Sequence, residues 1–175
     1  SFFIFILGKI YMALKTSILI FILSVIPSQG ITKTAHIITT AGDISFTFFT
    51  KQAPKTSNKI FSLFKSNFYK GISFHRVIKG FVAQAGDPTG TGMGGSGKKI
   101  LFENNNLKHQ YGMVGLARSG DDLNSGDSQF YICLNTLPHL DGQYVIFAKV
   151  TKGIEVLQRI VKGTKILSTS VEESK

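Results

Sequence analysis

The side chains best suited to chemistry are concentrated in one stretch, FHRVIKGFVAQAGD at residues 74–87, where an arginine and a glutamine stand among aromatic residues. Three later segments repeat this mixture of polar and apolar residues: GLARSG at 115–120, SQFYI at 128–132 and HLDG at 139–142. Together they offer hydrogen-bond donors beside apolar surface, which suits the binding and electrostatic stabilisation of a ligand. These four segments are the candidates for a functional site.

The sequence lacks the usual motifs of metal binding and of nucleophilic catalysis. The four histidines, His36, His75, His109 and His139, lie far apart, and no His-x-x-x-His pair presents two ligands from one helix. There is no Gly-x-Ser-x-Gly motif, and Cys133 is the only cysteine, so neither an internal disulfide nor a Cys-x-x-Cys redox pair can form. We therefore expect structural histidines, a buried cysteine and no metal.

A glycine-rich segment, TGTGMGGSG at residues 89–97, is a weaker candidate. Gly90, Gly92 and Gly95 fit the spacing G-x-G-x-x-G of dinucleotide-binding loops, and the segment resembles most of a phosphate-binding P-loop but lacks its Ser or Thr. Both motifs need a following helix whose N-terminal amides hold phosphate, and residues 98–106 show no helical periodicity. We expect a surface loop in which glycine lets the backbone bend sharply.

The chain is strongly basic, with a formal net charge of +10 at pH 7. Its lysines occur singly or in pairs, such as Lys98 and Lys99, without a long basic run or interleaved aromatic residues of the kind that bind nucleic-acid strands. We therefore expect a generally basic surface and no nucleic-acid partner. A secreted basic protein that acts at nucleic-acid or membrane surfaces is an alternative that rests on the charge alone.

Short runs of alternating apolar residues predict the elements that must position these segments. Residues 35–40 and 44–48 are typical of two strands joined by a tight turn, which form a hairpin. Apolar residues at spacings of three and four predict a helix that begins at Pro54 and a second, short helix over 154–161. Further strands are predicted at 74–78, 82–84, 112–117, 129–134, 145–150 and 165–171. This pattern indicates a mainly β fold, a closed antiparallel barrel or a sandwich, in one domain over residues 31–175.

Residues 1–30 differ in composition from the rest of the chain, because they are strongly apolar. If translation starts at Met12, then Lys15 is a short positive n-region, residues 18–26 are an apolar h-region, and residues 28–30 are a small-x-small cleavage site. This pattern predicts a secretory signal peptide and an exported protein, in the periplasm, the lumen of the secretory pathway or the extracellular space. A membrane anchor that is not cleaved is the alternative.

The four segments, in this order and at nearly these separations, resemble the signature blocks of the cyclophilin family. The similarity extends from about His36 to Val171 and is specific, because four separate blocks would have to coincide by chance. It implies a closed eight-stranded antiparallel β-barrel capped by two α-helices, in agreement with the elements predicted above. It also implies peptidyl-prolyl cis-trans isomerase activity on proline-containing polypeptides, which makes or breaks no covalent bond and needs no cofactor.

The resemblance also implies roles for individual residues. Arg76 is the implied catalyst, because its guanidinium can donate hydrogen bonds to the prolyl nitrogen or to the neighbouring carbonyl oxygen. Phe81 and Gln84 complete the catalytic group, Phe81 as a wall of the proline pocket and Gln84 as a holder of the substrate backbone. The other residues implied to line the pocket or the substrate groove are Val82, Ala117, Arg118, Gln129, Tyr131, His139, Leu140 and Tyr144.

Four of these positions depart from the family pattern. His139 stands where the family often has a Trp that contributes to binding the inhibitor cyclosporin, so we expect weakened inhibition. Tyr131 replaces a Phe and adds a hydroxyl that must reach water or a partner. Tyr144 replaces a His and can still donate a hydrogen bond. Arg118 replaces an Asn at a position where backbone groups can make the contact.

The alternative to an isomerase is a binding module that holds proline-containing clients, or docks a partner, without useful turnover. Arg76, the residue implied as catalyst, argues against this alternative. We expect a monomer in either case.

Overall fold

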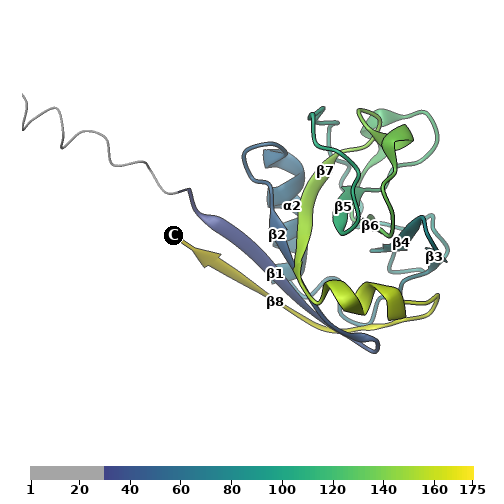
Figure 1. Ribbon diagram of the computed structural model, residues 1–175. Coiled ribbons are helices and arrows are strands. Elements are labelled where there is room, and N and C mark those ends of the chain that lie inside the picture. The colour runs from purple at the N-terminus through teal and green to yellow at the C-terminus, as the bar shows by residue number, and fades with distance from the viewer. Residues whose placement is uncertain (1–29) are drawn as a thin grey trace, which may run out of the picture. The chain divides into compact units, whose positions relative to one another are not determined.

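A computed structural model describes residues 30–175 (Figure 1). The segment predicted as a signal peptide or membrane anchor, residues 1–30, lies outside the described residues except for its last glycine. From that glycine onward, no helix combines the length and the apolar character needed to cross a membrane.

Eight strands form one sheet in which every paired neighbour is antiparallel (Figure 1). They are β1 (Thr32–Thr39), β2 (Gly42–Phe48), β3 (Arg76–Ile78), β4 (Val82–Ala85), β5 (Met113–Leu116), β6 (Phe130–Cys133), β7 (Ile146–Lys152) and β8 (Ile166–Ser174). Their order in the sheet is β3-β4-β6-β5-β7-β2-β1-β8. Each strand predicted from the sequence is present, and the predicted hairpin of β1 and β2 is confirmed.

The sheet curls until the segments before its two edge strands meet. Ser73, just before β3, and Lys165, just before β8, form an isolated antiparallel bridge. Beside it, the backbone N–H of Phe74 donates to the carbonyl of Thr164 at 2.8 Å. The described ladders do not pair β3 with β8 themselves. The predicted closed barrel is therefore a curled eight-stranded sheet whose seam is held by this bridge and not by a full ladder.

One predicted helix is confirmed as α2 (Pro54–Lys65), which covers one side of the core with Ile60 and Phe64. Proline suits its first turn, but no side chain of the preceding residue caps the free N–H groups there. Glu103, from a distant loop, takes this role. Its carboxylate accepts the backbone N–H of Lys55 at 2.8 Å and that of Thr56 at 2.7 Å.

The second predicted helix is present, but it is a 3₁₀ helix, η3 (Ile154–Arg159), and not an α-helix. Its apolar residues Ile154, Leu157 and Ile160 recur every third residue, which matches three residues per turn. Leu157 and Ile160 are buried, whereas Ile154 is 41% and Val161 62% exposed, so only part of the predicted stripe faces the core. Two further 3₁₀ turns, η1 (Leu123–Ser125) and η2 (Pro138–Leu140), lie in loops.

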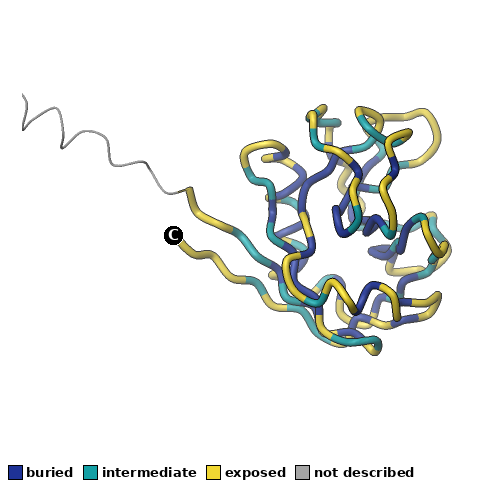
Figure 2. The backbone as a smooth tube through the Cα atoms, in the orientation of Figure 1, coloured by how far each residue is buried: buried dark blue, intermediate teal, exposed yellow. Residues whose placement is uncertain are grey.

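The central strands are buried along most of their length (Figure 2). Their apolar residues are divided between two clusters. In β6, Phe130 and Ile132 belong to the main core, while Tyr131 and Cys133 belong to a second, smaller cluster. Successive side chains of a strand point to opposite faces, so the main core fills the inside of the curled sheet and the second cluster lies on its outer face. This outer cluster contains most of the predicted pocket residues.

Candidate active site

Four residues from the predicted site region form a row across four neighbouring strands. Arg76 of β3 pairs with Gln84 of β4, Gln84 pairs with Tyr131 of β6, and Tyr131 pairs with Gly115 of β5. Residues paired directly across antiparallel strands point to the same face, so this row lies on the outer face of the sheet. Arg76 is exposed, Gln84 is half-buried and Tyr131 is buried.

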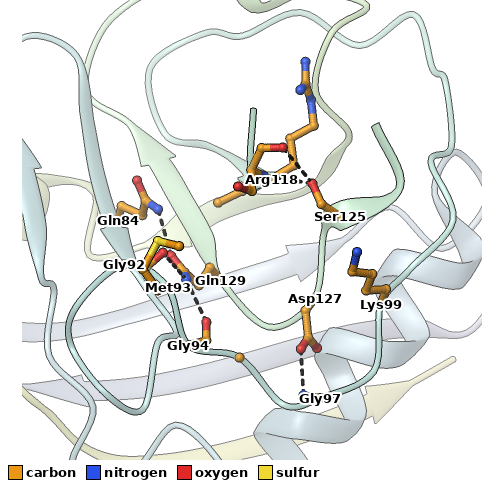
Figure 3. A pocket seen from close by; sticks show the side chains of 13 residues that line it. Gln84, Gly92, Met93, Gly94, Gly97, Lys99, Arg118, Ser125, Asp127 and Gln129 are labelled. Carbon is orange, nitrogen blue, oxygen red and sulfur yellow. Dashed lines mark hydrogen bonds between the residues drawn. The ribbon is translucent and has the colours of Figure 1, made fainter. Parts of the chain in front are cut away.

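A chain of side-chain amides orients the polar part of this row (Figure 3). The Gln129 amide N–H₂ donates to the carbonyls of Gly92 at 2.9 Å and Gly94 at 2.8 Å. Its oxygen then accepts from Gln84 at 2.9 Å, and the Gln84 oxygen accepts from Arg76 Nη1 at 3.3 Å. Because an amide has one donor end and one acceptor end, the two backbone carbonyls determine the orientation of both glutamines. The hydrogen bond from Arg76 to Gln84 uses only one of the several N–H donors of the guanidinium.

Aromatic side chains form the apolar part of the site beside Arg76. The Arg76 guanidinium carbon lies 5.7 Å from the centroid of the Phe81 ring, and His139 stacks on the same ring at 5.9 Å and 16°. Tyr131 and Tyr144 meet edge to face at 5.9 Å and 87°. The outer cluster holds six of the predicted residues: Phe81, Val82, Ala117, Tyr131, Leu140 and Tyr144. Segments far apart in the sequence thus meet at one apolar surface next to a guanidinium.

On the polar side of the row lies a cavity of about 580 Å³ (Figure 3). Its lining includes four residues predicted for the site: Gln84, Ala117, Arg118 and Gln129. The glycine-rich segment supplies much of the remaining wall, with Lys99, Ser125 and Asp127 opposite. The segment that we predicted to be only a bending surface loop is therefore part of the site, because its carbonyls orient Gln129 and its backbone lines the cavity.

Two carboxylates hold this glycine-rich segment in place. Asp87 accepts the backbone N–H of Gly92 at 2.6 Å, and Asp127 accepts that of Gly97 at 2.8 Å. Burial raises the pKa of Asp87, but hydrogen bonds from Thr89, Gly94 and Gly92 outweigh it and lower that pKa to about 2. A Cβ at Gly94 would lie 2.2 Å from Asp87 Oδ1, so the close approach of the backbone to this carboxylate requires glycine at position 94. Asp87, two residues before the segment, is a local sequence signal that could have indicated an ordered loop, whereas Asp127 is distant in sequence.

Arg118 lines the cavity with its backbone, while its side chain points away from the cavity (Figure 3). Its Nε donates to the carbonyl of Gln143 at 3.1 Å, and its Nη1 donates to the carbonyl of Gly120. The guanidinium carbon lies 4.5 Å from the centroid of the Tyr144 ring. The arginine therefore covers Tyr144 and leaves the groove at this position to backbone groups.

The expectation that the Tyr131 hydroxyl finds a partner is confirmed, because it lies 2.8 Å from Nε2 of His109. His109 in turn contacts Asp141. Sequence reasoning treated His109 as structural and left out Asp141, since nothing in their spacing links them to Tyr131.

Cys133 is buried as expected, and burial raises the pKa of its thiol to about 12, which keeps it protonated. Within residues 30–175, no group of three or more His, Cys, Asp or Glu side chains is placed to hold a metal ion.

Comparison with known proteins agrees with this geometry. The family described as "Cyclophilin type peptidyl-prolyl cis-trans isomerase/CLD" matches residues 34–174. A peptidyl-prolyl cis-trans isomerase of Helicobacter pylori is 43% identical over 155 residues, which cover 85% of this chain and 94% of the relative. The human peptidyl-prolyl cis-trans isomerase-like 3 is 45% identical over 129 residues, or 71% of this chain and 79% of the relative.

A solved structure resembles this one closely. The crystal structure of a cyclophilin-type peptidyl-prolyl cis-trans isomerase of Cryptosporidium parvum superposes with a TM-score of 0.76 at 34% identity, covering 82% of this chain and 99% of that one. A second structure of that protein, determined in the presence of the dipeptide Ala-Pro, gives a TM-score of 0.75. The chain therefore belongs to the family of cyclophilin-type peptidyl-prolyl cis-trans isomerases.

Proposed function

We propose that Arg76 is the electrostatic catalyst with which this chain accelerates rotation about X-Pro peptide bonds. The rotation is opposed by amide resonance, with a barrier of roughly 18–20 kcal/mol, so exchange without a catalyst takes on the order of tens to hundreds of seconds. A catalyst has to stabilise the twisted amide more than either planar isomer. In the twisted amide, the lone pair of the prolyl nitrogen is localised and accepts a hydrogen bond.

The observation that carries this proposal is the position of the Arg76 guanidinium between the amide chain and the apolar cluster. Gln84 accepts one of its N–H groups at 3.3 Å, and the Phe81 ring lies beneath it at 5.7 Å. These two contacts orient the donor fork without neutralising it, because neither partner carries a charge. An N–H group of Arg76 then points to the prolyl nitrogen of a proline that packs on Phe81.

Membership of this family implies that the substrate is a polypeptide that contains proline. We assign its proline ring to the surface of Phe81, Tyr131 and Leu140, with Val82 beside them. Its backbone runs along Gln84, where the amide chain offers donors and acceptors in fixed orientation. The remaining groove residues of this assignment are Ala117, Arg118, Gln129, His139 and Tyr144.

The test is exchange NMR on an Ala-Pro peptide with the wild type, Arg76→Ala and the control Lys51→Ala. Removal of one pre-organised donor costs about 10²–10³ in rate, and we expect kcat/KM of Arg76→Ala to fall by that factor. Lys51 is exposed in a turn. Its variant loses the same charge as Arg76→Ala and is expected to keep the wild-type rate.

An unchanged rate in Arg76→Ala contradicts the proposed mechanism. If the wild type shifts the peptide resonances without faster cis-trans exchange, the chain is a proline-binding module instead of an isomerase.

We further propose that the protein is exported, acts as a monomer and binds cyclosporin weakly. Export is supported by the apolar stretch and the small-x-small site within residues 1–30. N-terminal sequencing of the exported product is expected to begin near Ile31, and a retained apolar stretch would favour the membrane anchor.

Weak cyclosporin binding is supported by His139, whose imidazole stacks on Phe81 at a position where the family often has the indole of a tryptophan.

A further inference from the structure

Three side chains form a hydrogen-bonded chain beneath the outer cluster, from Asp141 through His109 to Tyr131. Asp141 Oδ1 lies 2.9 Å from His109 Nδ1, and His109 Nε2 lies 2.8 Å from the hydroxyl oxygen of Tyr131. The side chain of His109 is fully buried, and Tyr131 is 5% exposed. Polar groups buried in this way need their partners, so each member of the chain constrains the next.

The charge of Asp141 and the burial of His109 decide which atom donates in each bond. Hydrogen bonds from the backbone N–H of His109, from its ring and from Lys108 outweigh burial and lower the pKa of Asp141 to about 2. Asp141 is therefore an ionised acceptor at neutral pH, and His109 Nδ1 must carry a proton. Burial lowers the pKa of His109 despite the nearby carboxylate, so Nε2 is bare and accepts from the Tyr131 hydroxyl.

The ring of Tyr131 is also held on its other sides. Gly115 lies opposite in register, and a Cβ at Gly115 would lie 2.3 Å from Tyr131 Cζ. The ring therefore occupies the space that a side chain on β5 would fill. Tyr144 meets it edge to face. The His109 bond holds the hydroxyl end of the Tyr131 ring, and the same end of the ring lies close to Gly115.

We propose that His109 and Asp141 are positioning residues of the isomerase, which hold the ring of Tyr131 in the orientation that contacts the substrate proline. This inference rests on the proposed function, because it takes Tyr131 as part of the proline pocket. The side chain of His109 is fully buried, so it can act on the substrate only through Tyr131, from whose hydroxyl it accepts a hydrogen bond and whose ring it stacks against. A phenylalanine at position 131 would have no hydroxyl through which His109 could hold it.

A double-mutant cycle on kcat/KM tests this coupling in the full chain, with exchange NMR on an Ala-Pro peptide. Tyr131→Phe removes the hydroxyl and keeps the ring, and His109→Phe replaces the imidazole with an aromatic ring. Each single variant is expected to lower kcat/KM about two- to tenfold, mainly through KM, which is the range for one hydrogen bond. The double variant is expected to lose no more than either single variant. If the reductions in kcat/KM of the two single variants multiply in the double variant, the proposal is wrong.

A pH profile provides a second test, because His109→Phe removes the ring N–H that Asp141 accepts in the buried chain, and this variant can fail to fold. Protonation of His109 puts a hydrogen on Nε2, so the Tyr131 hydroxyl has to rotate and become an acceptor. We expect kcat/KM of the wild type to fall as His109 is protonated, with the protonation followed by the ¹⁵N shifts of its ring. The Tyr131→Phe profile is expected to lack this step. A step of equal size in both proteins overturns the proposal.

Other charged or titratable groups face the two rings. They are Lys108, His139 and Asp141 around His109, and Cys133, Tyr144, Arg118 and Asp141 around Tyr131. Histidines in general titrate in the same pH range, so the profile is repeated with His139→Phe. The step is expected to remain in that variant. Its loss there would assign the step to His139 and contradict the role of His109.

The result for this inference is separable from that for the proposed function. If the wild type accelerates exchange and Arg76→Ala does not, while the losses in the cycle multiply, then only the positioning role fails. If the wild type does not accelerate exchange, the proposed function itself is wrong.

Discussion

His139 is the residue whose replacement most directly tests the proposed weak binding of cyclosporin. Its imidazole stacks on Phe81, and a tryptophan in the same place would add aromatic area and an N–H donor. We expect His139→Trp to bind cyclosporin about tenfold more tightly, which corresponds to about 1.4 kcal/mol. Isothermal titration calorimetry measures this affinity. Gln158→Trp, which changes an exposed residue of η3, is the control and is expected to leave the affinity for cyclosporin unchanged. If His139→Trp and the wild type bind cyclosporin equally well, the proposed role of the ring at position 139 is wrong.

The resemblance of four segments to a known family was enough to select most of the candidate site residues, among them Arg76, Gln84 and Gln129. It was not enough for His109 and Asp141. A buried histidine with a carboxylate partner looks the same in sequence as any structural histidine. Its importance comes from the 2.8 Å contact with Tyr131, which depends on the packing of a loop under β6.

At the scale of elements, α2 depends on a residue far from it in sequence. Glu103 accepts two backbone N–H groups of its first turn, which no local side chain satisfies. We expect Glu103→Ala to lower the free energy of unfolding by about 1–2 kcal/mol, as loss of a helix cap does. Urea unfolding followed by circular dichroism measures the change. Glu155→Ala, an exposed acidic residue in η3, is the control, and an equal effect of both variants would argue against a capping role.

The second helix illustrates a limit of periodicity. Apolar residues at every third position fit both a short α-helix and a 3₁₀ helix, and only the hydrogen bonds distinguish them. The strands were easier to predict, because short apolar or alternating runs bounded by turn residues are too brief for an α-helix of ordinary length.

At the scale of the whole molecule, stability is expected to fall in acid in two stages. Burial lowers the pKa of His109 and His75 below 6.5, so the unfolded chain binds more protons and stability declines as pH falls below 6.5. Asp87 and Asp141 have pKa values lowered from 3.8 to about 2, so their contribution is present above 3.8 and is lost toward pH 2. Urea midpoints between pH 8 and pH 2 measure both stages. A constant midpoint from pH 7 to pH 4 would contradict the first, and Asp87→Asn is expected to reduce the second.

The sequence by itself determined the strands, the first helix and most of the candidate site residues, because the elements follow from local patterns of apolar residues and the candidates from motifs contiguous in the chain. Only the tertiary structure decided how they meet. The row of Arg76, Gln84 and Tyr131 depends on strand register, and the place of the glycine-rich segment depends on bonds from Gln129. The seam, the Glu103 cap and the link from His109 to Tyr131 likewise join residues distant in sequence. Such contacts form when the sheet curls, and local patterns do not encode them.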